Sequence, residues 1–336
     1  MRLSLAIAAF CLLASGLSAA AAETCPGNPD AIGTSRTITV DPATLPQIGS
    51  MQYKTTLPLE DHEVVLTFDD GPLPPNTNRI LDTLAENCVR ANYFLVGQMA
   101  NAYPSLVRRI YNGGHVVGTH SQHHPLTFRT MAEPRIESEV NGGIVSVKAA
   151  LGDPNALAPF FRIPGLLRAE RVETYLASQS IAVWSADEVA DDWRHGITAK
   201  DIVRLAINRI EAKDHRGVLL LHDIHPATAA ALPMLLKELK ARGYRIVQAV
   251  PAGERPLWVP EPLHPLVAED GGPWRALKAG APVEPKHKVA KIEKSAHHHK
   301  RVAHGEADAD VSAAIAKKKH KPQTATADHN VFSFWR

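Results

Sequence analysis

This chain of 336 residues has few cysteines, no long hydrophobic run and no large excess of one charge. The apolar stretch at residues 3–13 is too short to span a bilayer, and charges interrupt the segments after it, so we expect no membrane span. The 37 Lys and Arg residues nearly balance the 35 Asp and Glu residues, which gives no reason to expect nucleic acid as a partner. A hydrophobic content of 45% is enough for one large globular domain with appendages.

The first residues are typical of a secretory signal. Arg2 precedes the apolar stretch, and small residues follow it up to Glu23, so the sequence predicts cleavage after Ala22. We therefore expect an exported protein, either periplasmic or extracellular. Cys25 does not directly follow the small residues, which argues against a lipid-anchored cysteine.

The three cysteines allow at most one disulfide in the exported chain. Cys11 lies in the predicted signal, which leaves Cys25 and Cys88 in a compartment that permits disulfides. Two unpaired cysteines, one of them buried, are the alternative. We predict the disulfide, which would join the mature N-terminus to the segment before Ala91.

Residues 62–250 alternate between strand-like and helix-like patterns. Amphipathic segments include residues 131–151, residues 198–213 with Thr198 as N-cap, and residues 227–243 with Gly243 as C-cap. Short apolar runs rich in β-branched and aromatic residues occur at Glu63–Phe68, Tyr93–Val96, His115–Thr119, Pro159–Arg162, Ile181–Trp184, Gly217–Leu221 and Tyr244–Val247. About seven strands separated by helices predict an α/β fold, in which a parallel sheet with helices outside it is either closed as a barrel or open and doubly wound.

Polar residues stand at the carboxyl ends of these strands, where both folds place their functional sites. In strand order they are Asp69 and Asp70 of "VVLTFDDGP", His120, Arg162, Asp187 and His222. Taken alone, the aspartate pair would be read as an ordinary turn, because Asp, Gly and Pro favour turns. A purely structural barrel needs only caps and turn formers at this rim, so the whole set predicts a functional site.

The segment "GTHSQHHPLT" indicates a metal site. His120 and His124 are four residues apart, so one helical turn after the strand would put both imidazoles on one side. With the carboxylate of Asp70 they form a three-ligand set that leaves a position open on zinc. His123 is a competing ligand, although the spacing favours His124. The histidine pair in "LLLHDIHPAT" is less well placed, because its second member lies beyond the strand.

Four motifs, "TFDDGP", "HSQHHP", "FRIPG" and "LLLHD", occur in this order at predicted strand ends. Together with "ANYFLVG" and "LKARGYRIV" they resemble the polysaccharide deacetylases of carbohydrate esterase family 4, the nodulation-protein-B homology domain, over residues 62–250. The resemblance implies a distorted (β/α) barrel and hydrolysis of N-acetyl groups on N-acetylated sugars. It also implies a divalent metal, foremost Zn²⁺, with Co²⁺, Ni²⁺ or Mn²⁺ as alternatives.

Carried over residue by residue, the resemblance implies that Asp70 binds the metal together with His120 and His124. Asp69 would act as general base toward the attacking water, and His222 would protonate the departing amine.

Two further residues would orient this pair. Arg162 would keep Asp69 ionised beside a second carboxylate, with a salt bridge to a helix as the alternative. Asp187 would hold His222 in one tautomer. Asp192 competes with Asp187 for that role, because "SADEVADDW" is looser than the family's usual spacing.

On the substrate side the chain departs from the family. An aromatic residue followed by Gly usually comes after the proline of "FRIPG", but here Gly165 follows Pro164 directly. The backbone N–H of Gly165 would stabilise the oxyanion, and Leu220 would line the substrate site. Trp193 would supply the missing sugar-stacking face; the alternative is a more open groove.

The predicted organisation is a signal at 1–22, an N-terminal extension at 23–61, the deacetylase domain at 62–250 and a Pro-, Lys- and His-rich tail at 251–336. The tail composition predicts disorder, with electrostatic contact to an anionic envelope or polymer as its functional interpretation. We expect a monomer that deacetylates N-acetylglucosamine units of peptidoglycan or chitooligosaccharide. The alternatives are an amidohydrolase for small nitrogen compounds and an inactive carbohydrate-binding homologue.

Overall fold

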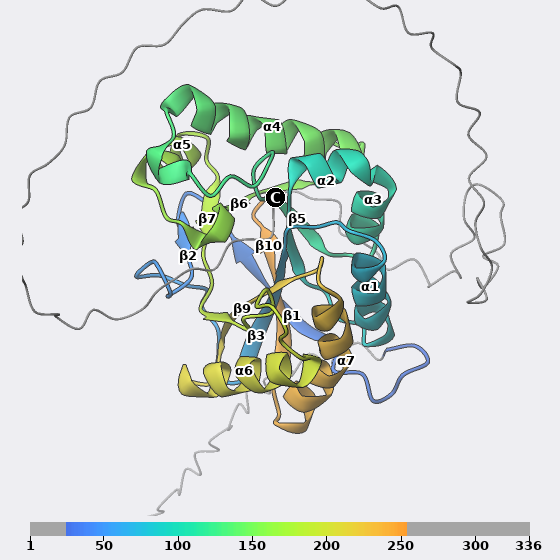
Figure 1. Cartoon of the computed structure of the whole chain (residues 1–336). Coiled ribbons are helices and arrows are strands. Elements are labelled where there is room, and N and C mark those ends of the chain that lie inside the picture. Colours follow the sequence, from blue (N-terminus) through green and yellow to red (C-terminus); the bar gives the residue numbers. More distant parts are fainter. Residues whose placement is uncertain (1–24, 254–336) are drawn as a thin grey trace, which may run out of the picture. The chain divides into compact units, whose positions relative to one another are not determined.

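The structure, a computed structural model, describes residues 25–253 (Figure 1). The predicted signal and nearly all of the predicted tail lie outside these residues. Among the helices of residues 25–253, none is both long enough and apolar enough to cross a membrane.

All seven strands expected from the apolar runs are present. They are β3 (Glu63–Asp69), β4 (Asn92–Leu95), β5 (Val116–Thr119), β6 (Leu157–Arg162), β7 (Ala182–Trp184), β9 (Gly217–His222) and β10 (Arg245–Pro251). Their pairings are parallel, and the strand order β10-β3-β4-β5-β6-β7 follows the chain apart from β10, while β9 pairs with β3. The predicted α/β class with a barrel-like parallel sheet is confirmed.

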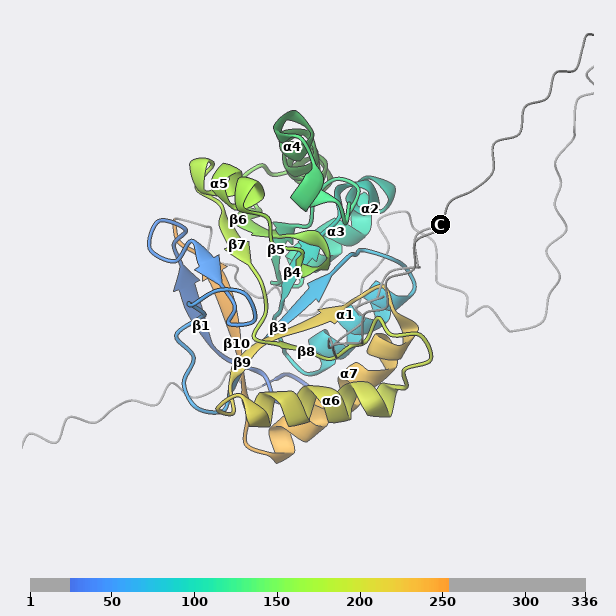
Figure 2. The ribbon, with the colours of Figure 1, turned by 60° about the vertical axis from the view of Figure 1, so that its left-hand side comes forward.

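Helices flank the strands on two sides. They are α1 (Asn76–Glu86), α2 (Gly97–Ala102), α3 (Pro104–Asn112), α4 (Glu133–Leu151), α5 (Glu170–Ser178), α6 (Ala199–Ala212) and α7 (Pro226–Ala241), with short 3₁₀ helices η1 (Phe128–Thr130) and η2 (Pro164–Leu166). In both views α4 and α5 lie on the opposite side of the strands from α6 and α7 (Figure 2). Thr198 caps α6 as predicted, because its side chain accepts a hydrogen bond from Asp201 N. Gly243 follows the C-cap Arg242 of α7 and takes a positive φ of 77°.

Three strands were not predicted, namely β1 (Thr34–Val40), β2 (Gln47–Ile48) and β8 (Glu188–Val189). β1 pairs with β10, and β2 pairs with β7, so residues expected to form an extension before the domain contribute two strands to its sheet (Figure 2). β1 is partly exposed and polar, and β2 and β8 have two residues each, so none of the three carries a long apolar run. The predicted disulfide between Cys25 and Cys88 is confirmed, and it ties the start of this segment to the residues after α1.

The side chains of β3 alternate between two cores. Leu66 and Phe68 face the helices in the larger apolar cluster, whereas Val65 belongs to a smaller cluster inside the barrel with residues of β1, β7 and β10. Because strand side chains alternate with a period of two, Thr67 and Asp69 point to the same interior as Val65. This parity directs Asp69 into the barrel at its carboxyl end.

Candidate active site

The carboxyl ends of neighbouring strands bring most of the predicted residues together. Asp69 ends β3 and lies in register with His222, which ends β9. Arg162 ends β6, and His120 directly follows β5. These residues come from four strands, and a parallel sheet gathers them at one rim as expected.

Asp70, His120 and His124 form a cluster that is able to hold a metal ion. Their ligand atoms lie within 4.8 Å of one another, and all three residues are buried. Asp70 Oδ1 lies 3.4 Å from His120 Nε2 and 3.2 Å from His124 Nε2. This buried oxygen has no hydrogen-bond partner, so a cation beside it would satisfy an atom that is otherwise costly to bury. One carboxylate and two imidazoles are a donor set suited to zinc and to related divalent metals.

The protonation of the cluster also fits a metal. His120 Nδ1 lies 2.7 Å from the carbonyl oxygen of Arg162, which only accepts, so Nδ1 carries the proton and Nε2 presents its lone pair. Burial lowers the pKa of His124 to about 4 despite the charge of Asp70, which keeps this imidazole neutral. Burial acts to raise the pKa of Asp70, but its contacts with the imidazoles of His120 and His124 and the charge of His222 outweigh burial and hold the pKa well below its usual range.

The residues between the two histidines form a loop instead of the helical turn expected from their spacing. Ser121 and His124 both adopt positive φ, 67° and 56°, and Ser121 Oγ accepts a hydrogen bond from His124 N. This tight loop brings the two rings to a centroid distance of 4.9 Å. The competing residue His123 points elsewhere, since its ring contacts Glu139 and its side chain is 59% exposed.

Asp69 lies beside the cluster and is paired with Arg162. Arg162 Nη1 donates to Asp69 Oδ1 at 2.7 Å and to Thr67 Oγ1 at 2.8 Å, while Nη2 donates to Ser185 O at 2.8 Å. The guanidinium is fully buried over the ring of Phe94, 4.2 Å from the centroid. It therefore contacts Asp69, and the helix-facing salt bridge considered as an alternative is not formed. Asp69 Oδ2, at 3.7 Å from His120 Nε2, faces the cluster.

His222 is oriented by Asp192, which corrects the expectation for Asp187. His222 Nδ1 lies 2.8 Å from Asp192 Oδ1, and Asp192 Oδ2 accepts from His222 N at 2.7 Å and from Thr228 Oγ1 at 2.6 Å. Burial acts to lower the pKa of His222, but the charge and hydrogen bond of Asp192, with the charges of Asp70 and Asp69, raise it to about 10. The imidazole is therefore cationic at neutral pH.

The carboxylate of Asp187 connects two other segments of the chain. It accepts hydrogen bonds from Ser50 N at 2.6 Å, Thr56 Oγ1 at 2.7 Å and Val218 N at 2.8 Å. These contacts fasten the loop after β2 to the start of β9. The strand β8 lies between Asp187 and Asp192, and it carries the chain along β9 so that only the later aspartate reaches His222.

The expected substrate-side residues surround this rim. Gly165 lies in η2, just after Arg162, with a φ of 62°. Trp193 packs edge-on against His222 at a centroid distance of 5.5 Å, and its buried Nε1 has no hydrogen-bond partner. Leu220 is 3% exposed and lies two residues before His222 on β9, so both side chains point to the same side of the strand.

Asp223 is a residue of this region that the sequence analysis did not single out. It is fully buried behind the loop that follows Asp70, and Thr77 Oγ1 donates to its Oδ2 at 2.6 Å. A Cβ added to Gly71 would meet Asp223 Oδ2 at 2.1 Å, so only glycine fits there. The position of Asp223 directly after His222 in "LLLHD" was the available signal.

Comparison with known proteins identifies the family. The family model described as polysaccharide deacetylase matches residues 57–184. A peptidoglycan-N-acetylglucosamine deacetylase of Bacillus cereus is 32% identical over 203 residues, 58% of this chain and 70% of the relative. The peptidoglycan-N-acetylglucosamine deacetylase PgdA of Listeria monocytogenes is 32% identical over 187 residues, 55% of this chain but only 37% of the relative.

A solved structure supports the same assignment. The peptidoglycan deacetylase Bd3279 of Bdellovibrio bacteriovorus superimposes with a TM-score of 0.57 at 29% identity, covering 65% of this chain and 59% of that one. The likeness thus reaches over the barrel but not over the whole length of these proteins. With its ordered motifs and rim cluster, this chain belongs to the polysaccharide deacetylase family.

Proposed function

We propose that this protein is a metal-dependent hydrolase that removes N-acetyl groups from N-acetylglucosamine units of a polysaccharide, with peptidoglycan as the first candidate and chitooligosaccharide as the second. The observation that carries the proposal is the arrangement of three groups at one rim. Asp70, His120 and His124 form a ligand cluster, the paired carboxylate of Asp69 lies next to it, and the cationic His222 is held nearby.

Asp69 is the proposed general base. Arg162 occupies one carboxylate oxygen at 2.7 Å, which leaves Oδ2 directed toward the cluster to accept a proton from the attacking water. The buried guanidinium also places a positive charge between Asp69 and its surroundings, next to the second carboxylate of Asp70.

His222 is the proposed general acid. An amine is a poor leaving group as an anion, so it needs a proton as the C–N bond breaks. Asp192 holds the proton on Nδ1 of His222 and keeps the ring cationic, which makes Nε2–H available for donation. The proposed base and the proposed acid are together the two proton-transfer groups that amide hydrolysis requires.

A divalent metal bound by Asp70, His120 and His124 would supply Lewis acidity toward the amide carbonyl and the water; Zn²⁺ is the first choice, and Co²⁺, Ni²⁺ or Mn²⁺ are alternatives. The backbone N–H of Gly165 is the proposed donor to the oxyanion. Trp193 and Leu220 are the proposed walls for the sugar and the acetyl group, since Gly165 offers no side chain.

The choice of substrate is supported by the relatives, which are named as peptidoglycan deacetylases. It also fits the predicted export, because peptidoglycan is an acetylated polymer outside the inner membrane. Chitooligosaccharides present the same N-acetylglucosamine unit, so they serve as defined test substrates.

The decisive assay is acetate release from N-acetylglucosamine oligomers of one to five units. We expect activity that chelation abolishes and that added Zn²⁺ or another divalent metal restores. Sugars bound away from the reacting acetyl group contribute to transition-state binding, so kcat/KM should rise with chain length, and the monosaccharide should react poorly.

Three outcomes separate the alternatives. No acetate release by a metal-loaded, folded protein, on oligomers or on peptidoglycan, supports the inactive binding homologue. A rate per acetyl group that stays flat from monomer to pentamer supports the amidohydrolase for small compounds. A chelation-insensitive rate contradicts the metal assignment.

A further inference from the structure

The loop that carries the two metal-binding histidines is held against one face of α4. The residues of this face are Glu139, Gly142, Gly143 and Ser146, spaced at i, i+3, i+4 and i+7, so they lie on one side of the helix. We call them the α4 stripe. None of the four was singled out by the sequence motifs of the site.

Glu139 is the first contact of the stripe. It is 3% exposed, and its carboxylate accepts from His123 N at 2.9 Å and lies 3.0 Å from His123 Nδ1. Its backbone oxygen also accepts from Gln122 N at 2.9 Å. A buried carboxylate on α4 thus holds the loop between His120 and His124 in place, through contacts with the residue directly before His124.

The two glycines let the loop approach the helix. A Cβ added to Gly143 would lie 2.8 Å from the backbone C and O of Ser121, which is closer than real contacts allow. A Cβ added to Gly142 would meet only side-chain atoms of Gln122, at 3.1–3.4 Å. Ser146 Oγ donates to Gln122 Oε1 at 2.8 Å and completes the contact.

The loop needs such support because its own conformation is unfavourable. Ser121 and His124 both have positive φ, which non-glycine residues adopt only where surrounding contacts impose it. A second wall is provided by α2, where Gly97 N donates to Ser121 O at 2.9 Å and Gln98 N to Gln122 O at 3.0 Å. The loop is therefore clamped between α2 and α4.

We propose that the α4 stripe positions the metal site: by fixing the loop Ser121–His124, it directs the imidazoles of His120 and His124 toward Asp70 before the metal binds. The stripe itself touches neither metal nor substrate. The inference rests on the metal set of the proposed function, and it adds the residues that set the metal affinity. Partners that orient ligands in this way typically change metal affinity by about 10–100-fold when they are lost.

Adjacent glycines provide a matched test. Gly→Ala inside a helix favours the helix equally at both positions, so the two variants differ in what the new methyl group meets. We expect Gly143→Ala to raise the dissociation constant for Zn²⁺ by about 10–100-fold, because the Ser121 backbone must shift. Gly142→Ala should stay within about threefold of the wild type, because the Gln122 side chain is able to adjust.

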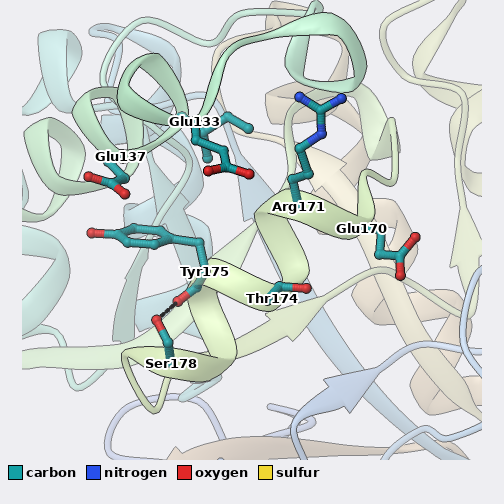
Figure 3. A pocket seen from close by; sticks show the side chains of 8 residues that line it. Glu133, Glu137, Glu170, Arg171, Thr174, Tyr175 and Ser178 are labelled. Atoms are coloured by element: carbon teal, nitrogen blue, oxygen red, sulfur yellow. Dashed lines mark hydrogen bonds between the residues drawn. The ribbon is translucent and has the colours of Figure 1, made fainter.

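A second pair tests the carboxylate. Glu139→Ala removes both contacts with His123 and should weaken Zn²⁺ binding on the same scale, whereas Glu139→Gln keeps an acceptor for His123 N and should restore most of the affinity. The control is Glu137→Gln, because Glu137 lies on α4 but lines an open groove of about 410 Å³ facing α5, where none of the proposed site residues lies (Figure 3).

Zn²⁺ affinity is measured on the full chain by competition with a chromophoric chelator, without substrate. The run His297–His299 and other histidines contribute background binding, which the His120→Ala/His124→Ala double variant measures. Thermal unfolding of each metal-free variant shows that it is folded. If Gly143→Ala does not fold, the Zn²⁺ affinities of the Glu139 variants and of Ser146→Ala, each compared with that of the wild type, test the inference in its place.

Wild-type Zn²⁺ affinity in Gly143→Ala and Glu139→Ala would overturn the inference. Equal weakening by Gly142→Ala and Glu137→Gln would overturn it too, since the effect would then be general to the helix. A wild-type chain that binds Zn²⁺ no better than the double variant contradicts the proposed metal site itself, so the two failures are distinguishable.

Discussion

Replacing Asp192 by Asn should move the pH dependence of turnover, because Asp192 is the group that keeps His222 cationic. The pKa of His222 is raised from 6.5 to about 10, and Asp192 provides the largest opposition to the effect of burial. At about 1.4 kcal/mol per pKa unit, the surroundings favour the imidazolium by roughly 5 kcal/mol. An isosteric Asn removes the charge but leaves the volume unchanged.

The direction of the expected pKa shift follows from the groups that still surround His222 after the substitution. Burial lowers the pKa of His222, and only the more distant carboxylates Asp70 and Asp69 still oppose it. Loss of an opposite charge in direct contact typically lowers such a pKa by about 1–3 units. The alkaline limb of the kcat profile should move toward acid by that amount, and kcat at pH 8 should fall by up to about tenfold, because a downward shift of about 3 units would leave roughly one imidazole in ten protonated there.

The assay is acetate release from a chitotetraose-type oligomer between pH 6 and 10 at saturating metal, with Zn²⁺ affinity measured separately. Asp187→Asn is the matched control, because Asp187 is equally buried but contacts Ser50, Thr56 and Val218 in place of His222. It should lower the unfolding temperature and leave the alkaline limb in place. An unmoved limb in Asp192→Asn, or an equal movement in Asp187→Asn, would refute the assignment.

The two adjacent aspartates should fail in different ways: Asp69→Asn should keep the metal and lose turnover by about 10²-fold or more, whereas Asp70→Asn should lose Zn²⁺ affinity first. Chelator competition combined with acetate release measures both, and the reverse pattern would mean that their roles are exchanged. His115 should make stability depend on pH, because burial lowers its pKa from 6.5 to about 3 and Ala91 N donates to its Nδ1. The unfolded chain then binds the extra proton below pH 6.5, so this contribution is complete above pH 6.5 and declines by about 1.4 kcal/mol per pH unit down to about pH 3. In urea unfolding the stability difference between wild type and His115→Gln should narrow by about 2 kcal/mol from pH 8 to pH 5, and a constant difference would contradict this reasoning.

Much of the fold was predictable from local patterns. The run Val64–Asp69 is apolar and β-branched, and its period of two already directed Asp69 and Asp70 to different sides. Because parallel strands end at one rim, the polar residues after five of the seven apolar runs were expected to meet there. The same rule brought together His120, Arg162 and His222.

What the sequence determined by itself are the features encoded by short stretches of neighbouring residues: the strands of the barrel, the cap at Thr198 and the set of residues at the rim. The tertiary structure alone decided which of two nearby aspartates orients His222, because strand β8 carries the chain past Asp187 before Asp192 reaches the imidazole. With only two residues, β8 is too short to be predicted from a sequence pattern. It also decided that Glu139 and Gly143 support the metal-binding loop. That contact joins residues of a helix to a loop before it, and its geometry depends on the packing of α4 against the sheet, which no local pattern specifies.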